Sequence, residues 1–162
     1  MSNSIVLFDS RTNNTKKIAE AIALGLGTTA IAIETKPPLD DYNLIAFGSW
    51  VKKGTISSSS EKYLHSLPEK LIVNKKFVLF LTSSFPEKRN EKTDLTELET
   101  TFQAMRNILE KKQARVLDET FTAVGAVKLF SFGFGLMKRG HPTAEELDEA
   151  TQFGRDLKEK YL

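Results

Sequence analysis

Residues 5–26 read IVLFDSRTNNTKKIAEAIALGL, and this stretch decides the fold. The apolar run from Ile5 to Phe8 has the length of a buried strand. After a polar loop, a helix is predicted from about Thr15 to Leu26, and Gly25 and Gly27 at its end suit a left-handed cap. A strand, a loop and a helix in this order form the repeating unit of an α/β sheet.

The same alternation continues along the chain. Further strands are predicted at Ala30 to Glu34, Leu44 to Gly48, Phe77 to Leu81 and Val116 to Ala123. The first four of the five strands are apolar almost throughout, as expected where helices cover both faces of a sheet. The last strand is more polar and fits an edge. The fold class is therefore α/β, with a five-stranded, mostly parallel sheet.

The remaining helices have recognisable starts. One is predicted to begin in the serine run Ser57 to Ser60, and two others have the capping-box spacing, Asp94 with Glu97 and Thr143 with Glu146. Between the second and third strands, two prolines and two aspartates leave no room for a full helix, so this crossover is predicted to be short.

Length, charge and composition bound the function. The 162 residues are predicted to form one globular domain, 1–162, and the net charge of +2 gives no reason to expect nucleic acid as a partner. With no Cys and two His, the chain offers no thiolate chemistry and is a poor candidate for a transition-metal enzyme. The apolar runs are too short to span a membrane, so a soluble cytoplasmic protein is expected.

The loop after the first strand, Ser10 to Thr15, is rich in hydroxyl and amide side chains and leads directly into a helix. Ligands of open parallel sheets bind outside the carboxyl ends of the strands. The N–H groups of a helix N-terminus, together with hydroxyls, can bind a phosphate without a lysine. Helix capping explains the same residues, so both interpretations stay open at this point. The spacings of P-loop and dinucleotide-binding motifs are missing.

Three segments together resemble the flavodoxins and flavodoxin-like FMN proteins. Residues 10–22, SRTNNTKKIAEAI, are similar to the family's S-x-T-G-N-T loop and first helix, with Asn13 in the place of Gly. Asn is the second choice for a left-handed backbone, so this replacement is tolerable. Residues 48–55, GSWVKKGT, resemble the G-x-W-V-x-x-G loop, and Thr82 to Phe85 follow the fourth strand.

The resemblance implies a three-layer α/β/α sandwich with strand order 2-1-3-4-5 and one non-covalently bound FMN. The phosphate would lie over the first loop, and the isoalloxazine ring would stack on Trp50, with Phe85 as a weaker candidate for its opposite face. The residues implied in FMN binding are Ser10, Arg11, Thr12, Asn13, Asn14, Thr15, Ser49, Trp50, Val51, Lys52, Gly54, Thr82, Ser83, Ser84 and Phe85. No catalytic residue or metal ligand is predicted.

The segment before the last helix shares further features with the family. Residues 138–142, KRGHP, resemble the K-G-x-P opening of that helix, whereas Phe121 to Gly125 lack the Cys of an F-x-C-x-G sequence that several such proteins carry. Residues 128–140 form an aromatic and basic segment that could cover the flavin, contact a partner or fold back on the sheet edge. These three alternatives stay open.

Lys52 and Lys53 depart from the pattern of classical flavodoxins, which surround the ring with negative charge. The two lysines can be solvated loop side chains. A lysine near N1 of the ring would instead stabilise the reduced, anionic flavin and make the second reduction potential less negative.

The resemblance implies an electron carrier that shuttles one or two electrons between redox proteins, a reductase and an acceptor, which dock at the flavin edge. Two alternatives remain at this point: an FMN-dependent NAD(P)H reductase acting on quinones or similar acceptors, and a flavin-free accessory subunit. A monomer is expected.

Overall fold

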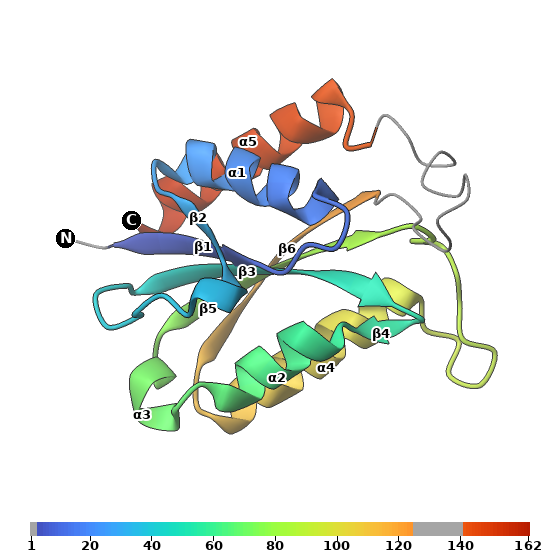
Figure 1. Ribbon diagram of the computed structural model, residues 1–162, viewed down its shortest axis with the longest axis horizontal. Helices are drawn as coiled ribbons and strands as arrows, with labels where there is room; N and C mark the ends of the chain where they lie inside the picture. Colours follow the sequence, from blue (N-terminus) through green and yellow to red (C-terminus); the bar gives the residue numbers. More distant parts are fainter. Residues whose placement is uncertain (1–2, 125–140) are drawn as a thin grey trace.

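A parallel sheet forms the centre of the computed structural model, which describes residues 3–124 and 141–162 (Figure 1). Its strands are β1 (Ser4–Phe8), β2 (Ala30–Ala32), β3 (Leu44–Lys52), β5 (Lys76–Ser83) and β6 (Arg115–Val124). They lie in the order β2-β1-β3-β5-β6, and the short β4 (Thr55–Ile56) pairs with β3 off this path. Because β4 only extends a hairpin, the predicted order 2-1-3-4-5 is confirmed for the five parallel strands.

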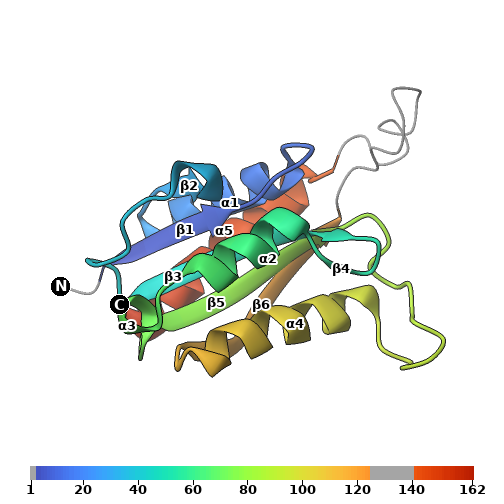
Figure 2. The same ribbon diagram turned by 60° about the horizontal axis from the view of Figure 1, so that its bottom comes forward.

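Helices cover both faces of the sheet, which gives the predicted three layers (Figures 1 and 2). One layer contains α1 (Asn14–Leu26) and α5 (Ala144–Tyr161), and the other contains α2 (Ser58–Ser66) and α4 (Glu97–Lys111). The short α3 (Glu69–Ile72) and the 3-10 turn η1 (Ile33–Thr35) lie in connections. α1 and α5 pack backbone to backbone, since a β-carbon on Gly154 would clash with the Ile22 carbonyl and one on Gly25 with that of Thr151.

Alternation along the central strands decides which side chains reach the carboxyl edge of the sheet. In β1 and β3, Leu7 and Phe47 belong to the core under α2 and α4, whereas Phe80 of β5 belongs to the core under α1 and α5. Since side chains alternate between faces, Asp9 and Ser49, two positions on, point to the α2 side. By the same rule, Thr82 points to the α1 side. The fold thus places polar side chains on both faces of one edge.

Three predicted boundaries were wrong in informative ways. β2 ends at Ala32, because residues 33–35 turn into η1. β3 continues past Gly48 to Lys52, because its next residues pair with the end of β5 and its last two pair with β4. The capping box of α4 is formed by Thr96 and Glu99 instead of Asp94 and Glu97. Asp94 has a φ of 55°, which is incompatible with the extended backbone of an N-cap. At the end of α1, only Gly27 is left-handed, with a φ of 75°.

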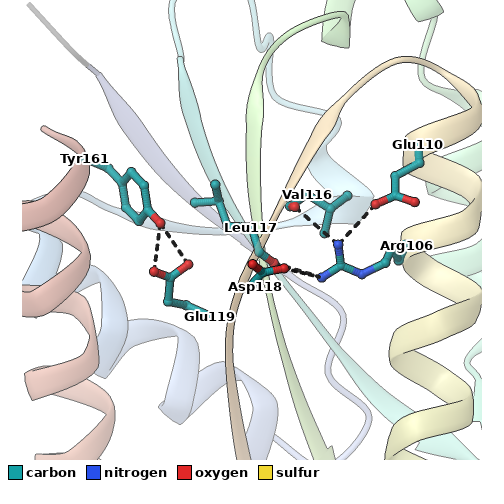
Figure 3. Close-up of polar contacts among 7 residues, drawn as sticks. All are labelled: Arg106, Glu110, Val116, Leu117, Asp118, Glu119 and Tyr161. Atoms are coloured by element: carbon teal, nitrogen blue, oxygen red, sulfur yellow. Dashed lines mark hydrogen bonds and ion pairs between the residues drawn. The ribbon is translucent and has the colours of Figure 1, made fainter.

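β6 is an irregular edge strand, and its polar residues and backbone bind it to the neighbouring helices. Among the described residues, β6 pairs with β5 alone, and its register shifts between Phe77, which pairs with Val116, and Leu79, which pairs with Thr120. On one side of this bulge, Arg106 donates to the carbonyls of Val116 at 3.3 Å and Leu117 at 3.0 Å (Figure 3).

Glu119, also in the bulge, accepts hydrogen bonds from the Tyr161 hydroxyl of α5 (Figure 3). It also accepts one from Lys160 of the same helix. These contacts, that of Lys160 first, lower the pKa of Glu119 to about 2. The predicted edge position of this strand is confirmed, and its polarity reflects two contacts that fix it to α4 and α5.

Candidate functional site

The loop between β1 and α1 bends sharply at Asn13, which has a φ of 64°. This left-handed conformation is what the replacement of a glycine by Asn predicts. The loop is closed by a hydrogen bond from the Lys16 amide to Ser10 Oγ at 3.2 Å. Thr15, buried in the first turn of α1, shares a hydrogen bond of 2.7 Å with Thr82 Oγ1 at the end of β5. The loop is therefore connected across the α1 side of the sheet to the end of β5.

The N-terminus of α1 differs from those of the other long helices that the structure describes. α2, α4 and α5 are capped by the hydroxyls of Ser57, Thr96 and Thr143, and each has glutamate in its first turn. The N-cap of α1, Asn13, makes no side-chain cap hydrogen bond, and the first turn of α1 contains no acidic residue. The positive end of this helix dipole therefore lacks the negative groups that the chain supplies elsewhere.

The segment predicted as a loop after the third strand is largely strand. Trp50, Val51 and Lys52 lie in β3, and the hairpin turns at Lys53 and Gly54, with φ of 47° and 79°. Two successive positive φ values are typical of a tight turn between antiparallel strands.

Trp50, in this hairpin, contacts the first loop. Its indole is half-buried, and the Arg11 guanidinium lies over it, 5.4 Å from the ring centroid. A cation over an aromatic face is an attractive contact. The first loop and the hairpin therefore meet directly.

Residues 82–85 complete the edge. Thr82, which pairs with Trp50 in the sheet, and Ser83 are buried, and Ser84 is half-buried. Phe85 is 47% exposed, and its amide donates to Ser83 Oγ at 3.2 Å. No ring contact joins Phe85 to Trp50 among the described residues. The structure thus brings together the strand-end residues of all three segments but leaves Phe85 at the rim.

A buried polar cluster centred on Asp9 was missed by the sequence analysis. Asp9 is 4% exposed, and its Oδ2 accepts hydrogen bonds from the hydroxyls of Ser57 at 2.6 Å, Ser60 at 3.1 Å and Ser59. Ser60 also donates to Ser49 Oγ at 2.7 Å. The signal in the sequence was a carboxylate ending an apolar strand, together with four consecutive serines. The cluster connects β1, β3 and α2 directly beneath the first loop.

Several predictions fall on residues that lie outside the described parts of the chain. These are the alternatives for residues 128–140, the K-G-x-P resemblance at 138–140, and Gly125. Within the described part, β6 ends at Val124, whose amide donates to Glu146 Oε1 at 3.4 Å. Glu146 also accepts from the Thr143 amide at 2.6 Å, which confirms the predicted capping box of the last helix.

The strand order defines a class of protein, the doubly wound α/β proteins, whose ligands bind at the carboxyl ends of the strands where the winding direction reverses. Residues 5–130 match the family model described as Flavodoxin domain. The chain belongs to this family. Among curated protein sequences, none matches the chain significantly.

Solved structures share the fold at low identity. A flavodoxin from the domain Archaea superposes with a TM-score of 0.73 at 19% identity, covering 97% of this chain and 96% of that one. Oxidised Flavodoxin 1 from Bacillus cereus gives 0.63 at 17%, covering 98% of both chains. The Flv1 flavodiiron core from Synechocystis sp. PCC6803 gives 0.64 at 17%, covering 98% of this chain and 35% of that one. In the described part of the chain, no helix has both the length and the apolar character that crossing a membrane requires.

Proposed function

We propose that this protein binds FMN non-covalently and transfers electrons between redox proteins. The observation that carries the proposal is the N-terminus of α1, where the N-cap Asn13 makes no side-chain cap hydrogen bond, the neutral Ser10 hydroxyl accepts from the Lys16 amide, and the first turn contains no acidic residue. A phosphate group is the natural partner of such a helix end, because the N–H groups and the helix dipole both favour an anion. Lys16 and Lys17 in the first turn favour it further.

The residues of the first loop, Ser10 to Thr15, would hold the FMN phosphate. Their hydroxyl and amide groups can donate to phosphate oxygens. The buried bond between Thr15 and Thr82 and the Asp9 cluster fix both sides of the loop, so little ordering is needed when the ligand binds. These contacts on both sides of the loop agree with a site that is formed before the ligand binds.

The isoalloxazine ring would stack on Trp50, with the backbone of the hairpin and of residues 82–85 along its edge. The half-buried indole already has the planar Arg11 guanidinium over its ring, 5.4 Å from the centroid, and the flat flavin ring would take up the same kind of contact. Phe85 lies at the exposed rim, so it is a weaker contact. When bound, FMN supplies the redox chemistry, because it accepts and releases electrons one or two at a time.

The carrier role is favoured over an enzyme by the state of Asp9. Its side-chain carboxyl group lies at the end of β1 and is the acid/base group that an enzyme could use there. It is buried, however, and accepts hydrogen bonds from three hydroxyls. A group in that position does not reach a substrate proton. An electron carrier needs no such residue, since the protein supplies position and electrostatics only.

Steady-state reduction of quinones and dyes by the FMN-loaded protein tests this role. With NADH or NADPH and no added reductase, we expect no turnover. With a flavodoxin reductase added, we expect electrons to reach a one-electron acceptor protein through FMN. Sustained NAD(P)H oxidation by the protein alone would make it a reductase and would overturn the carrier role.

A further inference from the structure

The positive charge of the chain is concentrated at the candidate flavin edge. Residues 10–19 and 49–60 contain Arg11, Lys16, Lys17, Lys52 and Lys53, and they contain no Asp or Glu. The rest of the chain holds the other 18 of the 23 basic residues against all 21 acidic residues. Two of the three segments at the edge are therefore strongly basic, whereas the third, residues 82–96, is balanced, with three basic and three acidic residues.

The side chains of these cations reach solvent. Arg11, Lys16, Lys17, Lys52 and Lys53 are all exposed. Lys16 lies 3.9 Å from Glu20 on the next turn of α1, and Lys52 is 3.4 Å from Ser58 Oγ. Glu97 approaches the hairpin at Gly54 but is paired with Lys88, and Asp9 is buried and bonded to serines. Little of this charge is neutralised by the chain itself.

In the loop after β5, at the same edge of the sheet, positive side chains are paired with carboxylates. There, Lys88 pairs with Glu97 at 3.3 Å, and Arg89 pairs with Asp94 at 3.8 Å. A bound FMN phosphate would offset part of the charge near α1, but two negative charges do not cancel five positive ones. Lys52 and Lys53 lie on the hairpin instead, beside the residue proposed to stack on the ring.

We infer that the redox partner of this protein presents an acidic surface, and that it docks on the face formed by Arg11, Lys16, Lys17, Lys52 and Lys53. This inference rests on the proposed function and adds the chemistry of the partner. Complementary charge speeds encounter and orients the two redox centres, and exposed Phe85 at the same edge offers an apolar contact. The partner's acidic groups would surround the point where its own redox centre comes closest to solvent.

Equilibrium binding of two small redox proteins of opposite charge tests the inference, with calorimetry as the readout. The probes are an acidic [2Fe-2S] ferredoxin and basic cytochrome c, each titrated into both the FMN-loaded and the FMN-free protein. We expect the ferredoxin to bind at least about 10-fold more tightly than cytochrome c at ~0.02 M salt, and to weaken about 10-fold at ~0.15 M salt.

Two double variants of equal charge separate a local surface from net charge. Lys17→Glu with Lys53→Glu reverses the proposed face, and Lys70→Glu with Lys158→Glu reverses two exposed lysines near the amino edge of the sheet. We expect the first pair to weaken ferredoxin binding about 10-fold and the second less than about twofold. Circular dichroism checks that both variants fold.

The inference is overturned if cytochrome c binds as tightly as ferredoxin, or if the two double variants weaken ferredoxin binding equally. Direct reduction by NADPH that is lost in Lys17→Glu with Lys53→Glu would also overturn it, because the face would then serve a dinucleotide. A protein that takes up no FMN, seen separately by absorption, contradicts the proposed function, whereas ferredoxin binding to the FMN-free protein still reports on the charged face.

Discussion

The two walls of the candidate flavin site are built in different ways. The first wall, the loop Ser10 to Thr15 with the β3–β4 hairpin, lies on buried polar contacts that join β1, β3, β5 and α2. The second wall, residues 84–96, is held by contacts within itself, with the end of β5 and with the first turn of α4. Its ion pair between Arg89 and Asp94 is solvent-exposed, with side chains 58% and 93% accessible.

This difference indicates that one wall is formed in advance and the other can adjust. Buried hydrogen bonds are costly to break because a lost partner leaves a polar group without water. Exposed ion pairs contribute little, so the second wall can move at small cost in free energy. We expect the first wall to determine FMN affinity and the second to adapt to the bound ring and to a partner.

The largest expected effect follows from removing Asp9. Asp9→Ala leaves buried Ser57 and Ser60 without their shared acceptor, so we expect the free energy of unfolding in urea to fall by about 2–4 kcal/mol. The matched variant in the second wall, Asp94→Ala, removes an exposed carboxylate and should cost less than about 0.5 kcal/mol. Equal costs for the two variants would contradict the difference between the walls.

The two aromatic side chains should also contribute unequally to FMN affinity. Trp50→Ala removes the half-buried stacking surface, and we expect the Kd for FMN to rise by about 10- to 100-fold, in line with ~1.5–3 kcal/mol. Phe85→Ala, at the exposed rim, should raise it less than about fivefold. Fluorescence quenching of FMN on binding measures both values. A larger loss in the Phe85 variant would place the main ring contact on the second wall.

The bond between Thr15 and Thr82 allows a test of how well the first wall is fixed. Thr15→Val leaves the buried Thr82 hydroxyl without this partner and should lower the free energy of unfolding by about 1 kcal/mol. The double variant with Thr82→Val removes both polar groups and should recover much of that loss. If the losses in the free energy of unfolding of the two single variants simply add in the double variant, the bond contributes nothing to stability.

The smallest expected effect concerns the lysines of the hairpin. Lys52→Glu and Lys53→Glu should each make the second reduction potential of FMN more negative, by an amount on the order of tens of millivolts, because both side chains are exposed and screened. Lys92→Glu in the second wall should shift it less. A redox titration in which all three variants match the parent protein would remove the electrostatic role of Lys52 and Lys53.

Much of the fold could be predicted from local patterns in the sequence. Buried strands such as Phe77 to Leu81 are apolar throughout, and the replacement of Gly by Asn13 preserved a left-handed turn. The Asp9 cluster could not be predicted in this way, because it joins residues about 50 positions apart and depends on the face to which each side chain points. The position of Trp50 within a strand depends on its pairing with Thr82 of β5, and β3 then continues to Lys52 by pairing with β4, which is too short to show a pattern of its own.

The first loop and Trp50 are together proposed to form an FMN site. The most direct measurement is the visible absorption spectrum of the purified protein, followed by titration of the FMN-free protein with FMN and mass analysis of the released cofactor. We expect a yellow protein that binds one equivalent of FMN with a Kd below about 1 µM. A folded, colourless protein that takes up no FMN in this titration would show that the first loop and Trp50 do not form an FMN site.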